Sequence, residues 1–228
     1  MPSVLVTGSS RGLGLEFVRQ YAADGWRVFA GARRPEAAAE LGAVALAAAG
    51  RVTLHAFDVA EHRTVDRLAR ELAGEPIDIL LNAAGLAGHE PQAFGLVDYS
   101  DWLAVLQVNV MGPLKMAESF VDHVEASERR TIAILSSRMG SIHETPGGYY
   151  PYSSSKAAVN MVGRSLAADL DARDITVVML NPGPVAAATD RGGLSATASV
   201  AQLRAVIERL TPADSGSFLN YDGSACPW

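Results

Sequence analysis

The chain has 228 residues, of which 49% are hydrophobic and 19% charged, and its formal net charge is −6. This composition suits one large globular domain with an apolar core, and a negative net charge without a basic stripe argues against a nucleic-acid partner. The one cysteine, Cys226, excludes an internal disulfide framework.

The N-terminal segment and the hydropathy pattern indicate where the protein works. Met1–Ser3 leads directly into an apolar strand, without the charged and apolar regions of a secretory signal. The sequence contains no apolar run long enough to span a bilayer. We therefore expect a single domain over residues 1–228, located in the cytoplasm and without a membrane partner.

Short apolar runs alternate with longer segments of helical periodicity along the whole chain. The strands are expected at Ser3–Thr7, Arg27–Ala32, Val52–Phe57, Ile77–Asn82, Thr131–Ser136, Thr176–Asn181 and Phe218–Asn220. The helices are expected at Leu13–Asp24, Pro35–Ala49, His62–Ala73, Ser100–Glu125, Tyr152–Ala172 and Val200–Leu210. Alternation of this kind predicts an α/β fold, a Rossmann-type doubly wound parallel sheet of about seven strands with helices on both faces. Ligands of such a sheet bind beyond the carboxyl ends of its strands.

The loop after the first strand, Thr7–Gly14, contains three glycines and opens a helix. Glycines let the backbone approach a pyrophosphate closely, and a helix N-terminus offers unpaired N–H donors and positive potential. The spacing is Gly-x-x-x-Gly-x-Gly rather than the commoner Gly-x-Gly-x-x-Gly, so a plain strand-to-helix turn is the alternative interpretation. Its position after the first strand favours a dinucleotide site. The residues expected to bind the cofactor here are Gly8, Ser10, Arg11, Gly12, Leu13 and Gly14.

The second strand ends in Ala32-Arg33-Arg34, where a chain that binds NAD is expected to place a carboxylate for the ribose. Arg33 or Arg34 could pair with the 2′-phosphate of NADP, and Arg11 could add charge from the glycine loop. The sequence therefore favours NADP(H), with NAD(H) as the second choice. The alternative is that both arginines are solvated loop charges.

Tyr152 and Lys156 lie four residues apart in a stretch that is expected to begin a helix, so both side chains lie on one helix face. A cationic Lys beside a phenol lowers the pKa of the phenol, and bringing a Tyr from ~10 to neutral pH needs a shift of about 3 units. Such a pair can act as a general acid/base toward a carbonyl or an alcohol. The neighbouring Tyr149 and Tyr150 have no Lys four residues further on, and they could line the pocket or simply pack.

Four motifs follow one another in the expected places: Thr7–Gly14, Asn82–Gly85, the Tyr152/Lys156 pair and Asn181–Gly183. With these motifs the chain resembles the short-chain dehydrogenase/reductase family over essentially its whole length. The segments that further resemble the C-factor-like branch of that family are Gly12–Phe17, Ser136–Ser141 and Phe218–Gly223.

The resemblance implies roles for the matching residues. Asp58 resembles the acid that meets the adenine amino group, although an Asp there would also suit a helix N-cap. Asn109 resembles the mid-helix Asn that holds a water bridging to Lys156. Ser137 resembles the Ser that hydrogen-bonds the substrate carbonyl, and its neighbour Ser136 is the weaker candidate. The further cofactor-binding residues implied are Val59, Asn82, Ala83, Ala84, Gly85, Pro182, Gly183, Val185 and Thr189, together with Tyr152 and Lys156.

Two stretches depart from the family pattern. The loop that precedes Tyr152 looks longer than usual, and its His143, Glu144 and Gly147-Gly148 either shape the substrate pocket or form a solvated surface loop. After Gly183, Pro184 stands where relatives commonly have an aromatic residue, and three alanines delay Thr189. Only the short stretch Asp190–Ser199 is left to cover a substrate, so we expect an open or mobile pocket that disfavours tight recognition of one large substrate.

Together these features predict an NADP(H)-dependent oxidoreductase that reduces an aldehyde or ketone to an alcohol, or runs in reverse, with Tyr152 as proton donor or acceptor. The five histidines form no i, i+4 pair, so no metal is expected. The expected partners are a small-molecule carbonyl or alcohol and further copies of the chain. The resemblance implies a homodimer or homotetramer formed through the two long helices, Ser100–Glu125 and Tyr152–Ala172.

Two other functions stay open at this point. A nucleotide-binding signalling or sensor protein of C-factor type would use the same fold with little or no turnover, but it would not need a proton donor. A non-redox use of the fold, such as dehalogenation, is disfavoured because those relatives replace the Lys and lose the glycine loop, and this chain has both.

Overall fold

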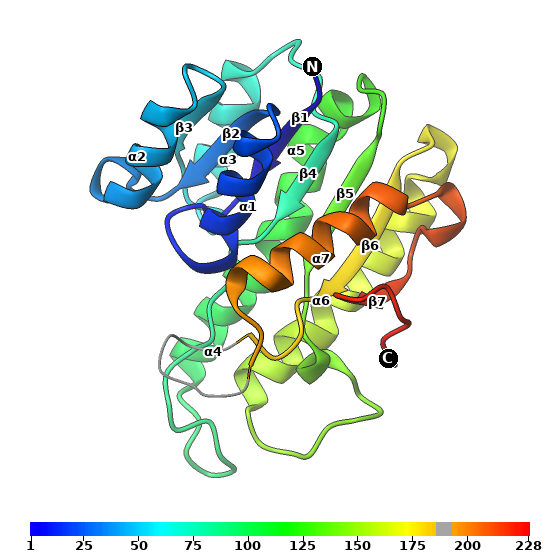
Figure 1. Cartoon of the computed structure of the whole chain (residues 1–228). Helices are drawn as coiled ribbons and strands as arrows, with labels where there is room; N and C mark the ends of the chain where they lie inside the picture. The colour runs from blue at the N-terminus through cyan, green and yellow to red at the C-terminus, as the bar shows by residue number, and fades with distance from the viewer. Residues whose placement is uncertain (186–192) are drawn as a thin grey trace.

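The computed structural model describes residues 1–185 and 193–228, and one sheet of seven parallel strands lies at its centre, in the order β3-β2-β1-β4-β5-β6-β7 (Figure 1). The strands are β1 (Ser3–Val6), β2 (Arg27–Ala32), β3 (Val52–Ala56), β4 (Ile79–Asn82), β5 (Thr131–Leu135), β6 (Thr176–Asn181) and β7 (Phe218–Asn220). The parallel sheet and its strand number confirm the prediction from the alternating pattern. The strand order reverses between β1 and β4, which is the switch point where such sheets bind ligands.

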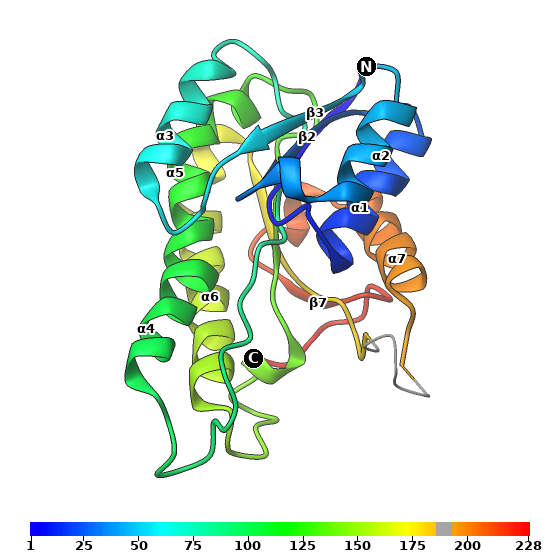
Figure 2. The same ribbon diagram turned by 90° about the vertical axis from the view of Figure 1, so that its left-hand side faces the viewer.

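Helices cover both faces of this sheet, as predicted. Figure 2 shows α1, α2 and α7 on one side of the strands and α3, α5 and α6 on the other. The helices are α1 (Gly12–Ala23), α2 (Ala39–Ala47), α3 (His62–Glu71), α4 (Tyr99–Leu106), α5 (Gly112–Glu125), α6 (Tyr150–Asp169) and α7 (Ala196–Arg209). Among the helices in the described parts of the chain, none has the length and hydropathy needed to cross a bilayer.

Each face of the sheet has its own apolar core. Val4 and Val6 of β1 belong to the cluster packed under α1, α2 and α7, whereas Leu5 belongs to the cluster under α3, α5 and α6. All four residues of β1 are buried. Because helices cover both faces, the central strands are nearly continuous apolar runs, whereas in the edge strand β3 half-buried residues alternate with exposed ones after the buried Val52.

Two of the expected helices are interrupted. At Pro35–Ala49 a 3₁₀ turn (Pro35–Ala37) precedes α2. At Ser100–Glu125 the chain forms α4, then a π-helical segment (Gln107–Met111), then α5. Pro113 in the first turn of α5 has no N–H to donate, which fits a change of hydrogen-bonding pattern just before it.

Two helix boundaries also differ from the expectation. α6 begins at Tyr150 and ends at Asp169, because a 3₁₀ turn (Asp171–Arg173) follows it. α7 begins four residues early, where the hydroxyl of Ser195 caps it by accepting a hydrogen bond from the backbone N–H of Ala198 at 3.0 Å. Tyr152 consequently lies in the first turn of α6, next to the ends of the central strands.

Candidate active site

The positions of the three glycines in the first loop require glycine for two different structural reasons. A Cβ on Gly8 would lie 2.7 Å from the Cα of Ala84, and one on Gly14 would lie 2.2 Å from the carbonyl oxygen of Gly8. Gly12 has a φ of +57° and nothing within 4 Å of a would-be Cβ. Gly8 and Gly14 therefore allow backbone segments to pack closely, whereas Gly12 leaves open space at the start of α1.

The N-terminus of α1 faces this open space, and the first N–H groups of a helix have no partner within the helix. Its N-cap residue is Arg11, which makes no side-chain capping hydrogen bond. The loop is fixed against β1 and β2, because Ser9 donates its N–H to Gly31 O at 2.9 Å and its hydroxyl to Val6 O at 2.8 Å. Free N–H groups at a helix N-terminus bind anions, so this loop fits a phosphate group.

Thr7 connects the glycine loop to the turn after β4. Its hydroxyl oxygen accepts hydrogen bonds from the backbone N–H groups of Ala83 and Ala84, both at 2.9 Å. Thr7 is only 1% exposed. Sequence reasoning placed Thr7 in the loop motif without giving it a role, because the partner segment is 76 residues away.

A cavity of about 490 Å³ lies at the carboxyl ends of the central strands. The predicted site residues that line it are Gly8, Ser10, Arg11, Gly12, Leu13, Gly14, Arg33, Asp58, Val59, Ala83, Ala84, Gly85, Tyr152, Lys156 and Pro182. The other residues that line the cavity are Gly31, Ala32, Phe57, Leu86, Ala87 and Val108, which sequence reasoning missed, and Ser136, which it named only as the weaker candidate for the substrate carbonyl. Each of these lies within two positions of a predicted residue, so extending every motif by two residues would have found them.

Four predicted cofactor residues do not line this cavity: Arg34, Asn82, Gly183 and Val185. Asn82 is buried as the last residue of β4. Gly183 packs on Tyr221, whose ring would lie 2.6 Å from a Cβ at that position, and Val185 pairs with Leu194 in an isolated bridge. The predicted contact of Thr189 with the cofactor lies outside the described residues, as do residues 190–192 of the expected cover, whereas its last four residues, Ala196–Ser199, lie in α7.

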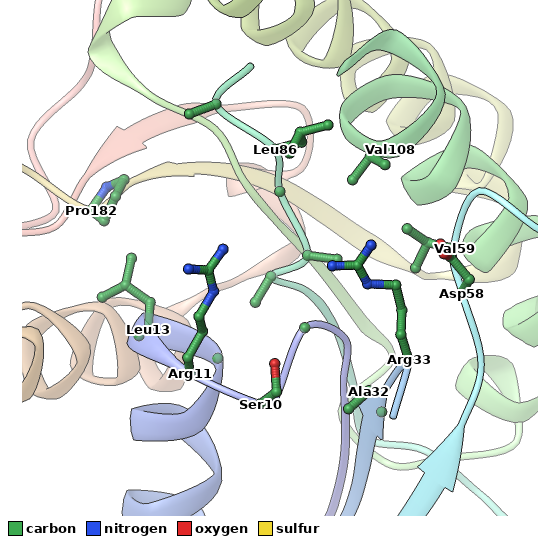
Figure 3. A pocket seen from close by; sticks show the side chains of 18 of the residues that line it. Ser10, Arg11, Leu13, Ala32, Arg33, Asp58, Val59, Leu86, Val108 and Pro182 are labelled. Carbon is green, nitrogen blue, oxygen red and sulfur yellow. The ribbon is translucent and has the colours of Figure 1, made fainter. Parts of the chain in front are cut away.

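Arg11 and Arg33 direct their guanidinium groups into the cavity, as Figure 3 shows. Both side chains are exposed, and neither forms an ion pair with any other described residue. Asp58 lies across the cavity and accepts a hydrogen bond through Oδ1 from Ala60 N–H at 3.0 Å. The N-cap of α3 is Glu61, so the helix-cap alternative for Asp58 is wrong.

Lys156 is buried under the ring of Tyr152. Its Nζ lies 5.7 Å from the ring centroid and donates a hydrogen bond to Leu135 O at 2.9 Å. Burial lowers the pKa of Lys156 to about 8. One hydrogen of the ammonium group is thereby committed to the protein, and the others face the cavity that Lys156 lines.

The pKa of Tyr152 moves in the direction opposite to the expectation. Burial raises the pKa of the phenol, and the interaction with the Ser137 hydroxyl lowers it by less. The ammonium of Lys156 lies 5.7 Å from the ring centroid and is bonded to Leu135 O, and it does not offset the effect of burial on the phenol. The phenol therefore holds its proton at neutral pH.

The structure separates the two adjacent serines after β5. The hydroxyl of Ser136 is buried and donates to Oδ1 of Asn160 at 2.6 Å. Ser137 is half-buried, accepts only a 3.2 Å hydrogen bond from Met139 N–H, and interacts with the phenol of Tyr152. Ser137 can therefore still donate its hydroxyl proton, but Ser136 and not Ser137 lines the cavity, so the choice between the two serines stays a prediction.

Asn109 lies in the π-helical segment, 1% exposed. Its Oδ1 accepts from Leu86 N–H at 2.8 Å, and its Nδ2 donates to Leu86 O and to the hydroxyl of Ser155, both at 2.9 Å. Both amide hydrogens are thus committed to the loop after β4 and to α6. This side chain fastens two walls of the site together, and the predicted water bridge to Lys156 stays a prediction.

Close packing fixes α6 against the segment after β5. A Cβ on Gly140 would lie 2.7 Å from the carbonyl carbon of Lys156, so only glycine fits there. Asn181 Oδ1 accepts from Arg138 N–H at 3.1 Å, which joins the ends of β5 and β6. These contacts hold the segment that contains Ser137 against the first turns of α6.

The loop before Tyr152 is anchored at His143 and Glu144, the two residues that sequence reasoning named in it. Glu144 accepts a hydrogen bond from the Arg138 guanidinium at 2.8 Å, and this contact lowers the pKa of Glu144. His143 donates its backbone N–H to Trp228 O at 2.9 Å. Among the described residues, no group of His, Cys, Asp and Glu side chains is arranged to hold a metal ion.

Comparison with known proteins agrees with this geometry. The chain matches the family model described as short chain dehydrogenase over residues 2–196. It is 40% identical over 158 residues to C-signal of Myxococcus xanthus, which covers 67% of this chain and 93% of that protein. It superposes on carbonyl reductase Sniffer of D. melanogaster with a TM-score of 0.91 at 30% identity, over 100% of both chains. The NADPH-bound carbonyl reductase from chicken fatty liver gives a TM-score of 0.91 at 28% identity, over 100% of this chain and 99% of that one.

Proposed function

The chain belongs to the short-chain dehydrogenase/reductase family of oxidoreductases, and on this premise we propose that it is an NADP(H)-dependent carbonyl reductase. The observation that best supports the proposal is a single cavity with two kinds of wall. The start of α1 and the side chains of Arg11 and Arg33 line one part of it, and Tyr152 and Lys156 line another. A dinucleotide is long enough to need both parts, with its phosphates at the first and its reactive ring at the second.

NADP(H) is the cofactor that fits the residues present. β2 ends without a carboxylate, and Arg33 directs a guanidinium into the cavity just beyond it. The guanidinium would pair with the 2′-phosphate, and Asp58 would accept a hydrogen bond from the adenine amino group. The similar carbonyl reductase from chicken binds NADPH, which agrees with this preference.

The proton needed for carbonyl reduction would come from Tyr152. When bound, NADPH supplies the hydride that forms the new C–H bond at the carbonyl carbon. The hydroxyl of Tyr152 gives its proton to the carbonyl oxygen, which leaves an alcohol as product and a phenolate on the protein. Burial raises the pKa of Tyr152, so the phenol holds a proton to give at neutral pH.

Ser137 and Lys156 would support this proton transfer in different ways. The hydroxyl of Ser137 donates a hydrogen bond to the carbonyl oxygen and so stabilises the negative charge that develops there. The ammonium of Lys156 lies near the phenolate as it forms, and its remaining hydrogens can hold a ribose hydroxyl. Burial of Lys156 strengthens its electrostatic effect because water does not screen it.

A signalling role is the second candidate, and the similarity to C-signal is the observation that favours it. In that role the cavity would report a bound nucleotide with little or no turnover. The combination of Tyr152, Lys156 and Ser137 favours the enzyme, because a sensor has no use for a buried proton donor beside a hydrogen-bond donor.

The proposal is tested by following NADPH consumption with a panel of aldehydes, ketones and diketones, and by repeating each assay with NADH. We expect turnover of at least one carbonyl with NADPH and slower turnover with NADH. Tight NADPH binding without turnover of any panel member would contradict the enzyme proposal and support the signalling role. The panel would also identify the substrate class.

A further inference from the structure

Gln92, in the loop between β4 and α4, is a buried polar residue that no sequence motif includes. It is 4% exposed. Its Nε2 donates a hydrogen bond to Ala87 O at 2.8 Å, and its Oε1 accepts one from the backbone N–H of Tyr152 at 3.2 Å. Gln92 thus bridges a wall of the cavity and the proposed proton donor, which is 60 residues away in sequence.

The start of α6 has few other acceptors for its backbone donors. The N–H groups in the first turn of a helix have no partner within the helix. The N-cap residue of α6 is Tyr149, which has a φ of +48° and makes no side-chain capping bond, and Pro151 has no N–H. The acceptor for the N–H of Tyr152 comes from Gln92, so Gln92 acts as a distant cap of this helix.

A second hydrogen bond joins the same two segments. Nε1 of Trp102 donates to the hydroxyl of Ser154 at 3.0 Å, two residues beyond Tyr152. The segment that contains Gln92 and Trp102 is itself held in place, because Asp101 Oδ2 accepts from His89 N–H at 2.8 Å. Residues 88–102 therefore form a fixed support against the first turn of α6.

The other bond of Gln92 reaches the part of the cavity next to Tyr152. Ala87 and the preceding Leu86 both line the cavity. Leu86 is held on the far side by Asn109, through hydrogen bonds to both its N–H and its carbonyl. A shift of Gln92 would therefore change the distance between Tyr152 and this wall, where the substrate and the reactive ring of the cofactor must meet.

We propose that Gln92 is a positioning residue for proton transfer, which fixes the backbone of Tyr152 relative to the cavity wall at Leu86–Ala87. The inference rests on the proposed carbonyl reductase function. Gln92 touches no reacting atom and acts through the N–H of Tyr152. A displacement of about 1 Å at a reacting group can cost about 100-fold in rate, so a looser first turn would lower kcat more than it weakens binding.

The test is Gln92→Met, which keeps the length of the side chain and removes both its donor and its acceptor. We expect kcat for NADPH-dependent reduction of 4-nitrobenzaldehyde to fall about 10-fold or more, with the KM for NADPH within twofold of the wild-type value. Hydrogen exchange of the peptide 149–156 is expected to accelerate, because the N–H of Tyr152 loses its acceptor. This second readout requires no turnover.

Two further variants separate positioning from general stability. Gln92→Glu keeps an acceptor of the same length and is expected to retain more kcat and slower exchange than Gln92→Met, and it serves the comparison if Gln92→Met does not fold. Gln20→Met is the matched control, because the Nε2 of Gln20 donates to Thr197 O at 3.0 Å between α1 and α7, away from the cavity. We expect its kcat and its exchange in 149–156 to equal those of the wild type.

Failure of this inference is distinguishable from failure of the proposed function. A wild-type chain that reduces no carbonyl would overturn the proposed function. Normal wild-type turnover, together with a Gln92→Met kcat within twofold of it and unchanged exchange in 149–156, would overturn only the positioning role of Gln92.

Discussion

In the proposed function the cavity has a phosphate end and a catalytic end, and the two are built on different principles. The phosphate end uses backbone N–H groups from one short loop and the exposed side chains of Arg11 and Arg33. The catalytic end uses buried groups, among them Lys156 at 5% and Asn109 at 1% exposure. The hydrogen bonds that hold these buried groups join residues between 21 and 60 positions apart in sequence.

This difference predicts how each end responds to substitution. Exposed cations gain little from any single partner, so their loss changes affinity gradually. A buried polar group is costly when its partner is removed, so a single substitution at the catalytic end changes activity, stability or both. The following experiments would sharpen or break this contrast, beginning with the largest expected effect.

Lys156→Met is expected to lower kcat by about 1,000-fold while the protein stays folded, because general acid/base assistance contributes about 10² to 10⁴ in rate. Steady-state kinetics with NADPH and a carbonyl from the panel would measure the loss. Lys115→Met is the control, since Lys115 on α5 forms its ion pair with Asp66 at 2.6 Å, outside the cavity. A Lys156→Met kcat within tenfold of the wild type would argue against a role for this buried cation.

The two adjacent serines form a matched pair at the catalytic end. Ser137→Ala is expected to lower kcat about 100-fold with unchanged stability, because it removes the donor to the carbonyl oxygen. Ser136→Ala is expected to change kcat only a few-fold and to lower the free energy of unfolding by about 1 kcal/mol, because Asn160 Oδ1 loses its donor. Kinetics and urea unfolding of both variants would decide, and an exchange of the two phenotypes would refute the assignment.

The two adjacent arginines test the phosphate end. Arg33→Ala is expected to raise the Kd for NADPH about 10-fold and to leave the Kd for NADH unchanged, because the guanidinium would pair with the 2′-phosphate from an exposed position. Arg34→Ala removes the same charge from a residue that does not line the cavity, and it should change neither Kd by more than twofold. Calorimetric titration would measure both constants, and equal effects of the two variants would exclude a specific phosphate contact.

Replacement of Lys156 is also expected to change how the stability of the chain depends on pH. Burial lowers the pKa of Lys156 from 10.5 to about 8, so between these values the folded chain binds fewer protons than the unfolded chain, and its stability rises with pH. Below pH 8 the buried charge opposes folding. Lys156→Met should therefore be more stable than the wild type at pH 7 by about 2 kcal/mol, after the lost bond to Leu135 O is included.

The advantage of Lys156→Met should shrink as the pH approaches 10, since the wild-type Lys loses its charge. Chemical unfolding of both proteins at several pH values between 7 and 9.5 would show it. The raised pKa of Tyr21 affects both proteins and cancels in the difference. A variant less stable than the wild type at pH 7, or a difference independent of pH, would contradict the cost assigned to this buried charge.

The fold was predictable because its signals are local. The buried central strands are short apolar runs, and the sheet therefore follows from the sequence. The glycines of the first loop likewise predict a tight turn between a strand and a helix. The π-helical segment around Asn109 and the break after Pro35–Ala37 were not predicted, since helical periodicity does not distinguish the hydrogen-bond patterns of successive turns.

At the proposed catalytic end, the sequence indicated candidate residues but not their geometry. The sequence indicated Tyr152 and Lys156, yet the sign of the Tyr152 pKa shift depends on where the ammonium of Lys156 lies. Gln92 belongs to no sequence motif, and Thr7 received no role within its motif, because the bonds to Tyr152 and Ala83 join segments 60 and 76 residues apart. Spacing within a motif cannot reveal hydrogen bonds between distant segments.

The central claim is that Tyr152 supplies the proton in an NADPH-dependent carbonyl reduction. The most direct test compares Tyr152→Phe with Tyr149→Phe and Tyr150→Phe, measuring kcat with a panel carbonyl and NADPH binding for each. We predict that Tyr152→Phe binds NADPH with a Kd near the wild-type value but loses about 1,000-fold or more in kcat, whereas the two neighbours keep kcat within a few-fold. Full reductase activity in Tyr152→Phe would contradict the account.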